Sequence, residues 1–192
     1  MNTLFPVFLK LENLHTLVVG GGNVGLEKLT AIIANSPNAK VWLVAPEIKE
    51  EIVALAAAHP NVSLLYKAFE ESDLEDRDIV IAGTGLREVN ATVKEAAKRR
   101  KILANVADTP DLCDFYLGSV VQKGDLKIAI STNGMSPTLA KRLREMFAEI
   151  IPEGMQQLLD NLKAVRDQLK GDFDYKVNKL NEITSVMKDK KE

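Results

Sequence analysis

Three glycines stand at fixed spacing directly after a short apolar run. The run is HTLVVG, residues 15–20, and Gly20, Gly22 and Gly25 form G-x-G-x-x-G ahead of a stretch of helix-forming residues. In that setting the first glycine allows a tight turn, the second lets a pyrophosphate approach the backbone, and the third lets helix and strand pack closely. Amide groups at the N-terminus of the helix would then face the phosphates. The pattern predicts a dinucleotide site, and the alternative is a glycine-rich turn that binds nothing.

Further candidate contacts for a dinucleotide follow two other apolar runs. Glu47 comes shortly after residues 39–45, where an acidic residue can accept hydrogen bonds from an adenosine ribose. No arginine stands nearby to meet a 2′-phosphate, so NAD is favoured over NADP. The alternative for Glu47 is an acidic residue in the first turn of a helix opened by Pro46. Gly83 and Thr84 end another run and would lie along the nicotinamide side of the site.

The stretch ANVADTPDLCDF, residues 104–115, concentrates side chains that could do chemistry. Its polar or reactive members are Asn105, Asp108, Asp111, Cys113 and Asp114. A carboxylate here could accept a proton while a hydride leaves for the nicotinamide. The alternative is that Asp108 only caps a turn before Thr109. Cys113 is expected to be a small buried residue, because no histidine lies near it in sequence to activate a nucleophile.

Strand-like and helix-like segments alternate through the first hundred residues and would position these groups. The expected strands are 15–20, 39–45, 62–66, 78–84 and 101–106, and the expected helices are 23–35, 46–59 and 86–100. Such alternation is typical of an α/β fold with a doubly wound parallel sheet, as in Rossmann-like domains. Ligands of such sheets bind at the carboxyl ends of the strands.

The pattern changes after residue 112. Residues 118–132 predict an antiparallel hairpin that turns around Gly124, which could extend the sheet or pair with another subunit. Ser136 followed by a proline predicts the start of a helix that runs to about Ile150. Two polar helices separated at Gly171 and a charged tail, KDKKE, complete the sequence. We therefore expect three parts, a Rossmann domain over 1–112, a second segment over 113–150, and a helical region over 151–192.

Composition narrows the class of protein further. A net charge of −2 argues against a nucleic-acid surface, and the apolar runs are too short to span a membrane. With one cysteine and two distant histidines a Cys/His metal cluster cannot form, so no resident metal site is expected. The N-terminal stretch shows no basic leader or cleavage site, so we expect a cytoplasmic location.

Four sequence blocks occur in an order that resembles a known family. They are FPVF (5–8), VVGGGNVGLEK (18–28), NVADTPDLCDF (105–115) and GDLKIAISTNGMSPTLAKRLRE (124–145). Together they resemble the precorrin-2 dehydrogenase / sirohydrochlorin ferrochelatase family, which forms the front part of siroheme synthases. The match runs to about residue 150.

The resemblance implies an NAD-dependent enzyme that oxidises precorrin-2 to sirohydrochlorin. In bifunctional members ferrous iron is a further substrate and is inserted to give siroheme; whether this chain also does so stays open. The catalytic aspartate of the N-V-x-D block corresponds to Asp108. The implied NAD contacts are Gly22, Asn23, Val24, Pro46 and Glu47. Members of the family are homodimers in which the segment corresponding to 113–150 exchanges contacts between subunits.

The tetrapyrrole substrate carries many carboxylates and needs hydrogen-bond donors and local positive charge. A polar loop before the predicted helix at 137, the start of that helix and one lysine offer them. With the asparagine of the catalytic block, the expected substrate contacts are Asn105, Ser131, Thr132, Asn133, Gly134, Ser136 and Lys141. Asn133 departs from the family pattern, which often has glycine there. Two other functions stay open, a regulatory module that senses NAD without catalysis and an NAD oxidoreductase with another substrate.

Overall fold

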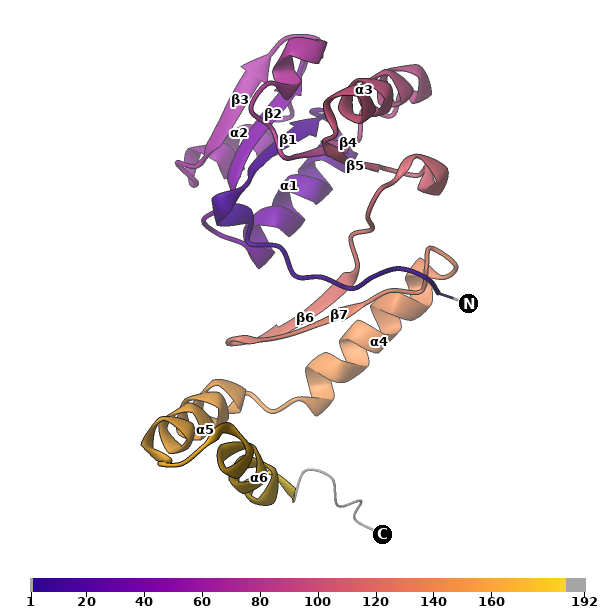
Figure 1. The fold of residues 1–192 in the computed structure, drawn as a ribbon. Coiled ribbons are helices and arrows are strands. Elements are labelled where there is room, and N and C mark those ends of the chain that lie inside the picture. Colours follow the sequence, from indigo (N-terminus) through magenta and orange to yellow (C-terminus); the bar gives the residue numbers. More distant parts are fainter. Residues whose placement is uncertain (1, 186–192) are drawn as a thin grey trace. The chain divides into compact units, whose positions relative to one another are not determined.

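The computed structural model describes residues 2–185, which form two compact units. The first unit is Met1–Leu117 and the second is Gly118–Glu192. Figure 1 shows the order of the elements within each unit. The charged tail KDKKE lies outside the described residues.

A five-stranded parallel sheet forms the first unit. Its strands are β1 (His15–Val19), β2 (Lys40–Ala45), β3 (Val62–Tyr66), β4 (Ile79–Ala82) and β5 (Leu103–Val106). They lie in the order β3-β2-β1-β4-β5, so the strand order reverses between β1 and β4. This arrangement confirms the expected Rossmann-like α/β fold and places the ligand-binding crevice beyond the carboxyl ends of β1 and β4.

Helices cover both faces of this sheet. They are α1 (Asn23–Asn35), α2 (Glu50–Ala57) and α3 (Arg87–Arg100), with short 3₁₀ helices at Leu11–Asn13, Glu71–Leu74 and Pro110–Leu112. Successive residues of a strand point to opposite faces. Val18 therefore packs with Leu29 of α1 on one face, while Leu17 packs with Val93 of α3 on the other. Figure 1 shows α1 and α3 against the two faces.

The start of α2 differs from the prediction. We expected a helix from Pro46, but residues 46–49 form a loop and the helix begins at Glu50. The Lys49 N–H donates to the Gly21 carbonyl at 3.0 Å, and a Cβ on Gly21 would collide with the Glu47 carbonyl. The loop is thus held against the glycine turn, and the reading of Glu47 as a first-turn helix residue is wrong.

Residues 113–115 stay with the first unit, because they bond to the outer edge of β5. The Asp114 N–H donates to the Ala104 carbonyl at 2.8 Å, and the Ala104 N–H donates back to Asp114 Oδ2 at 2.9 Å. Phe115 packs against the core on the α1 side of the sheet. The boundary between the units accordingly falls after Leu117, a few residues beyond the expected boundary at 112.

The second unit begins with the predicted hairpin. Strands β6 (Ser119–Lys123) and β7 (Leu126–Ile130) pair antiparallel, with Lys123 opposite Leu126. Gly124 takes a φ of 60° in the two-residue turn, a conformation that glycine adopts without strain. Helix α4 (Pro137–Ile150) follows, and the Leu139 N–H donates to Ser136 Oγ at 3.2 Å. The predicted hairpin and N-cap are therefore confirmed.

Two further helices follow α4, as predicted, but they belong to the second unit and do not form the separate part expected over 151–192. They are α5 (Met155–Gln168) and α6 (Phe173–Ile183), and Asp172 caps α6 through the Tyr175 N–H. Gln156 of α5 accepts a hydrogen bond from the Asp125 N–H at 2.7 Å, which ties α5 to the hairpin turn. Among residues 2–185, no helix has the length and apolar character needed to cross a membrane.

Candidate active site

Each of the three positions in the motif is occupied by glycine for a different physical reason. Gly20 takes a φ of 126°, and a Cβ there would run into the Gly83 carbonyl. A Cβ on Gly25 would strike the Gly20 carbonyl, so this glycine lets α1 pack against the turn. Gly22 has nothing within 4 Å of its Cβ position and is the N-cap of α1. The turn is therefore tight at its first and last glycine and open at the middle one, where a diphosphate can approach.

The end of β4 forms a second wall beside the glycine turn. The Gly83 N–H donates to the Val19 carbonyl at 2.8 Å, which holds the end of β4 beside the end of β1. A Cβ on Gly83 would lie 2.6 Å from Val24 Cγ1, so any larger residue here would displace the Val24 side chain. Gly85 takes a φ of 74° with open space around it. The expected cofactor residues of the two loops are thus neighbours at the switch point of the sheet.

Lys49 is a residue of this corner that the sequence argument missed. Its Nζ donates to Asn23 Oδ1 at 2.8 Å and lies 3.3 Å from Glu51 Oε1. Glu47 and Pro46, the expected ribose contacts, are exposed in the same loop. An ammonium group therefore stands at the first residue of α1, partly neutralised by Glu51. A lysine two residues after Glu47 was the available signal.

A cavity of about 420 Å³ opens beyond the carboxyl ends of β4 and β5. It joins the glycine turn to the block that carries the expected catalytic acid. Its lining residues are Val24, Gly83, Gly85, Arg87, Asn90, Ala107, Asp108, Thr109, Pro110 and Asp111. The structure therefore brings Val24 of the glycine turn and Gly83 of the loop after β4 together with Asp108, whereas Pro46 and Glu47 do not line this cavity. Arg87 and Asn90 are further members that the sequence analysis did not single out.

Asp108 lies in a tight turn directly after β5. Its φ of 57° is left-handed, a conformation that aspartate adopts more readily than most residues. The turn is closed by the backbone, because the Thr109 N–H donates to the Val106 carbonyl at 3.3 Å. Within residues 2–185 the Asp108 carboxylate has no hydrogen-bond or ion-pair partner, so it does not act as a turn cap. An exposed carboxylate at the cavity is free to accept a proton.

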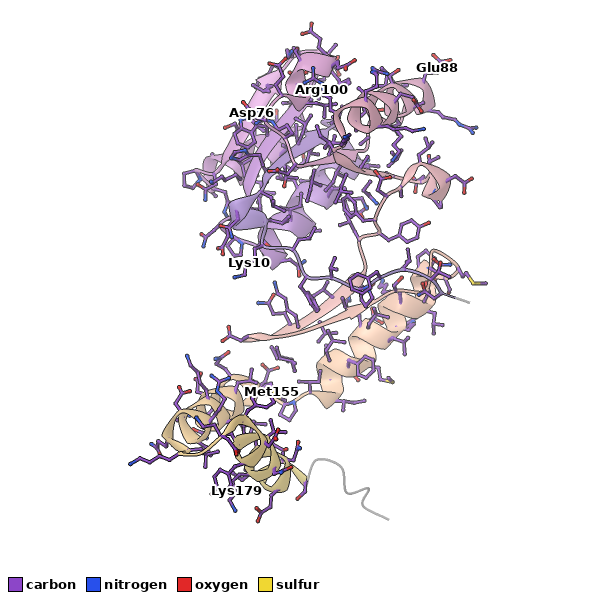
Figure 2. The ribbon with its side chains drawn as sticks, in the orientation of Figure 1. Lys10, Asp76, Glu88, Arg100, Met155 and Lys179 are labelled. Atoms are coloured by element: carbon purple, nitrogen blue, oxygen red, sulfur yellow. The ribbon has the colours of Figure 1, made fainter. Side chains whose placement is uncertain are left out.

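Asn90 of α3 forms the deepest polar part of the cavity wall. Its side chain accepts hydrogen bonds at Oδ1 from the Thr84 N–H at 3.2 Å and from Thr84 Oγ1 at 2.8 Å. Only 6% of Asn90 is exposed. Figure 2 labels Glu88 and Arg100 near the two ends of the helix that carries it. A polar residue on the otherwise apolar stripe of a helix was the signal that could have found Asn90.

Asn105 and Cys113 serve the local fold. Asn105 is 7% exposed, and its Nδ2 donates to the Phe115 carbonyl at 2.8 Å. The Cys113 thiol donates to the Val106 carbonyl at 3.2 Å, and burial raises its pKa. Cys113 is therefore a hydrogen-bonded thiol that is only partly buried, whereas we expected a buried side chain. The substrate role of Asn105 stays a prediction, since its amide is already engaged.

The expected substrate loop, residues 131–136, belongs to the second unit and is ordered by its own hydrogen bonds. The Ser136 N–H donates to Thr132 Oγ1 at 3.2 Å, and the Thr132 hydroxyl donates to the Ser136 carbonyl at 3.1 Å. Asn133 takes a left-handed φ of 54° and Gly134 one of 75°. Asparagine tolerates this conformation, so Asn133 fits a position where the family often has glycine.

Charged groups near this loop are exposed, and none is arranged as a metal cluster. Lys141 lies 3.9 Å from Glu145 Oε1 on the surface of α4. In the described part of the chain, no group of three or more His, Cys, Asp or Glu side chains is placed to hold a metal ion. The expectation of no resident metal stays a prediction.

Comparisons with known proteins identify the family. A family model described as "Putative NAD(P)-binding" matches residues 7–119, more than half of the chain, and the model "Sirohaem biosynthesis protein central" matches residues 123–149. Siroheme synthase of Pseudoalteromonas translucida is 38% identical over 88% of this chain and 35% of that protein. Siroheme synthase of Methylococcus capsulatus is 41% identical over 77% of this chain and 30% of that protein.

A solved structure is also similar over nearly the whole chain. It is "SirC, precorrin-2 dehydrogenase", with a TM-score of 0.74 and 27% identity, covering 94% of this chain and 89% of that one. The chain spans about a third of the length of the siroheme synthases that it matches. The glycine turn, the acid block and the polar loop all lie within the matched regions. The chain therefore belongs to the NAD(P)-binding family of the siroheme synthases, as its sequence blocks predicted.

Proposed function

We propose that this protein is an NAD-dependent dehydrogenase that oxidises precorrin-2 to sirohydrochlorin in siroheme biosynthesis. The observation that carries the proposal is the cavity in which Val24 of the glycine turn, Gly83 at the end of β4 and the free carboxylate of Asp108 meet. The siroheme synthase relatives and the similarity to a precorrin-2 dehydrogenase support this choice of substrate.

The residues present fit a dinucleotide. The open side of Gly22 and the N-terminus of α1 would hold the diphosphate, with the Lys49 ammonium next to Asn23 adding positive charge. Pro46 and Glu47 would meet the adenosine ribose. No arginine lies in residues 46–49, and Glu51 partly neutralises Lys49, which favours NAD over NADP.

Asp108 is the proposed proton acceptor. Precorrin-2 loses two electrons and two protons overall, which corresponds to one hydride and one proton. When bound, NAD⁺ supplies the acceptor for the hydride. The Asp108 carboxylate takes the proton from the carbon skeleton and returns it to solvent, so the electrons and protons balance. Its lack of another partner in residues 2–185 leaves both carboxylate oxygens available for this.

The polar loop at 131–136 and the start of α4 are the proposed contacts for the substrate carboxylates. They present backbone N–H groups and hydroxyls, and Lys141 is exposed one turn into the helix. Ferrous iron is the proposed second substrate if the chain is bifunctional. In that step the macrocycle nitrogens ligate the ion and release two protons, so the protein only has to accept protons.

Turnover of precorrin-2 tests the proposal directly. Precorrin-2 made without oxygen is incubated with the protein and NAD⁺, and we expect NADH absorbance and sirohydrochlorin colour to rise together. Binding of NAD without turnover would instead indicate a sensing module. Oxidation of another substrate with no effect on precorrin-2 would indicate a different dehydrogenase. Repeating the assay with ferrous ion determines whether siroheme is formed.

A further inference from the structure

Asn90 is a buried amide with one end committed to the protein and the other facing the cavity. It lies in the first turn of α3, 6% exposed, and lines the same cavity as Asp108. Few polar side chains of the first unit are so deeply buried, and a buried amide normally has its donors and acceptors satisfied. The NH₂ end of this buried amide is therefore expected to meet a hydrogen-bond acceptor of a bound ligand.

The orientation of the Asn90 amide follows from its partners. A backbone N–H can only donate, so the atom that accepts from Thr84 N at 3.2 Å must be the amide oxygen. Thr84 Oγ1, at 2.8 Å, reinforces the same end. The Asn90 NH₂ group is then the opposite end, and no hydrogen bond within residues 2–185 uses it. Because Asn90 lines the cavity and its oxygen is engaged by Thr84, we infer that the NH₂ group is the end that faces the cavity.

The chemistry of the cavity selects the ligand group that such a donor would meet. An NH₂ group needs an acceptor oxygen, either a neutral carbonyl or a carboxylate. Asp108 and Asp111 line the same space and would repel a carboxylate, whereas a neutral carbonyl is not repelled by them. A substrate carboxylate would be better met by Arg87, the one cation among the lining residues.

We propose that Asn90 is a positioning residue that donates a hydrogen bond from Nδ2 to the carboxamide oxygen of nicotinamide. Its neighbours Gly83 and Thr84 continue β4 at the switch point, beside Val24 of the glycine turn, where the nicotinamide half of a dinucleotide would extend. By fixing the ring, Asn90 sets which face of the nicotinamide meets the substrate. The inference rests on the proposed use of NAD.

The variant Asn90→Asp removes the NH₂ donor and adds a carboxyl group beside Asp108 and Asp111, so its effect is read against a ligand that lacks the nicotinamide. It keeps an oxygen for the Thr84 N–H and replaces the NH₂ group by a second oxygen. Calorimetric titration compares NADH, whose ring is neutral, with ADP-ribose, which lacks nicotinamide. We expect NADH affinity to fall about five- to tenfold, the usual effect of one lost hydrogen bond, while ADP-ribose affinity is unchanged. An equal NADH to ADP-ribose ratio in both proteins would overturn the assignment.

Two further measurements keep the test decisive. If thermal unfolding shows that Asn90→Asp is not folded, Asn90→Ala replaces it. We expect the same fall in NADH affinity with no change in ADP-ribose affinity. On the unaltered protein, the thionicotinamide analogue of NADH, a poorer acceptor, should bind more weakly than NADH, and equal binding would contradict the proposal.

Measuring precorrin-2 turnover by the variant and by the unaltered protein separates this inference from the proposed function. If Asn90→Asp leaves the binding ratio unchanged but raises KM for precorrin-2, the donor serves the substrate and the nicotinamide assignment is wrong. If the unaltered protein never oxidises precorrin-2, the proposed function fails, while a selective loss of NADH binding still supports the role of Asn90.

Discussion

Gly22 and Gly25 are glycines for opposite reasons, and substitution separates them. Gly22 has an ordinary φ of −90° and open space at its Cβ position, so Gly22→Asp is expected to fold normally. A carboxylate there would repel the diphosphate, and we expect NADH binding to be lost in calorimetry. Gly25→Ala forces a Cβ into the Gly20 carbonyl and should lower the free energy of unfolding by about 1–3 kcal/mol, measured by denaturant titration. Normal NADH affinity in Gly22→Asp would contradict the assigned site.

Asp108 carries the chemical step in the proposed reaction. Asp108→Asn removes the proton acceptor and is expected to lower kcat about 10²–10⁴-fold. NADH should still bind, because the glycine turn that would hold the diphosphate is unchanged. Asp111→Asn is the matched control, since it removes one negative charge from the same cavity without touching the proposed acceptor. Equal activity in the two variants would remove the case for Asp108.

Residues with local sequence signals were predictable, and residues placed by packing were not. The three glycines and Asp108 stand at fixed distances from strand ends, so spacing alone locates them. Asn90 enters the cavity because α3 packs on the sheet with that face inward, which no short motif records. Lys49 reaches Asn23 only because the loop before α2 folds against Gly21.

At the level of elements, β5 is braced along its outer edge by residues 113–115. Asp114 accepts a hydrogen bond from the Ala104 N–H and pairs with Lys94 of α3 at 2.6 Å. Burial raises the pKa of Asp114, but the hydrogen bonds from Lys94 and Ala104 outweigh it, and the pKa lies below its usual value. The turn that holds Asp108 is therefore fixed to both β5 and α3.

The contacts of Asp114 with Ala104 and Lys94 predict that stability depends on pH. A lowered carboxyl pKa contributes stability above the unfolded value, about pH 4, and that contribution is lost as the pH falls through the folded value. Asp114→Asn should therefore melt below the unaltered protein at pH 7, and the difference in Tm should shrink below about pH 4. A constant difference in Tm from pH 7 to pH 3 would show that ionisation of Asp114 does not matter.

Helices and strands have the predicted bounds where local sequence signals and tertiary packing favour the same structure. Residues 23–35 were predicted as a helix and α1 has those bounds, because its glycine start and apolar stripe act together. The helix expected from Pro46 begins at Glu50, since tertiary contacts with Gly21 overrule the helix-start signal. Ser136 was identified as the N-cap of α4 from its side chain and the proline that follows it, and the structure confirms the cap.

At the scale of the whole molecule, buried apolar side chains are distributed unevenly. The first unit has a core on each face of its sheet. In the described part of the second unit, the buried apolar residues are Val121 and Ala140. Large apolar side chains of α4 stay exposed instead, among them Met146 at 42% and Ile150 at 65%. The homodimer implied by the family resemblance stays a prediction, and exposed apolar side chains of this kind are typical of surfaces that bind another protein.

The homodimer can be tested on α4. Leu139, Met146 and Ile150 follow each other at seven and four residues and so share one helix face. Met146→Glu places a charge on that face and is expected to shift the protein from dimer to monomer in sedimentation velocity. Ala148→Glu adds the same charge on the opposite face and should leave the dimer intact. A monomeric unaltered protein would contradict the prediction.

The division into two units was only partly accessible from sequence. The hairpin and helices after residue 118 were predicted from their turns and caps. Their link to α5 includes Gln156, whose side chain bonds the hairpin turn across thirty-one residues of sequence, and the ion pair of Lys123 with Glu153. Such distant side-chain contacts leave no periodic pattern in the chain.

The state of the Cys113 thiol indicates whether a dimer of this protein would be held together by a disulfide. Because its proton is shared with the Val106 carbonyl and its pKa is raised, little thiolate exists at neutral pH. Alkylating reagents and air should therefore modify it slowly. A paired species seen without reductant would then be held together by noncovalent contacts, and denaturing gels should resolve it into single chains.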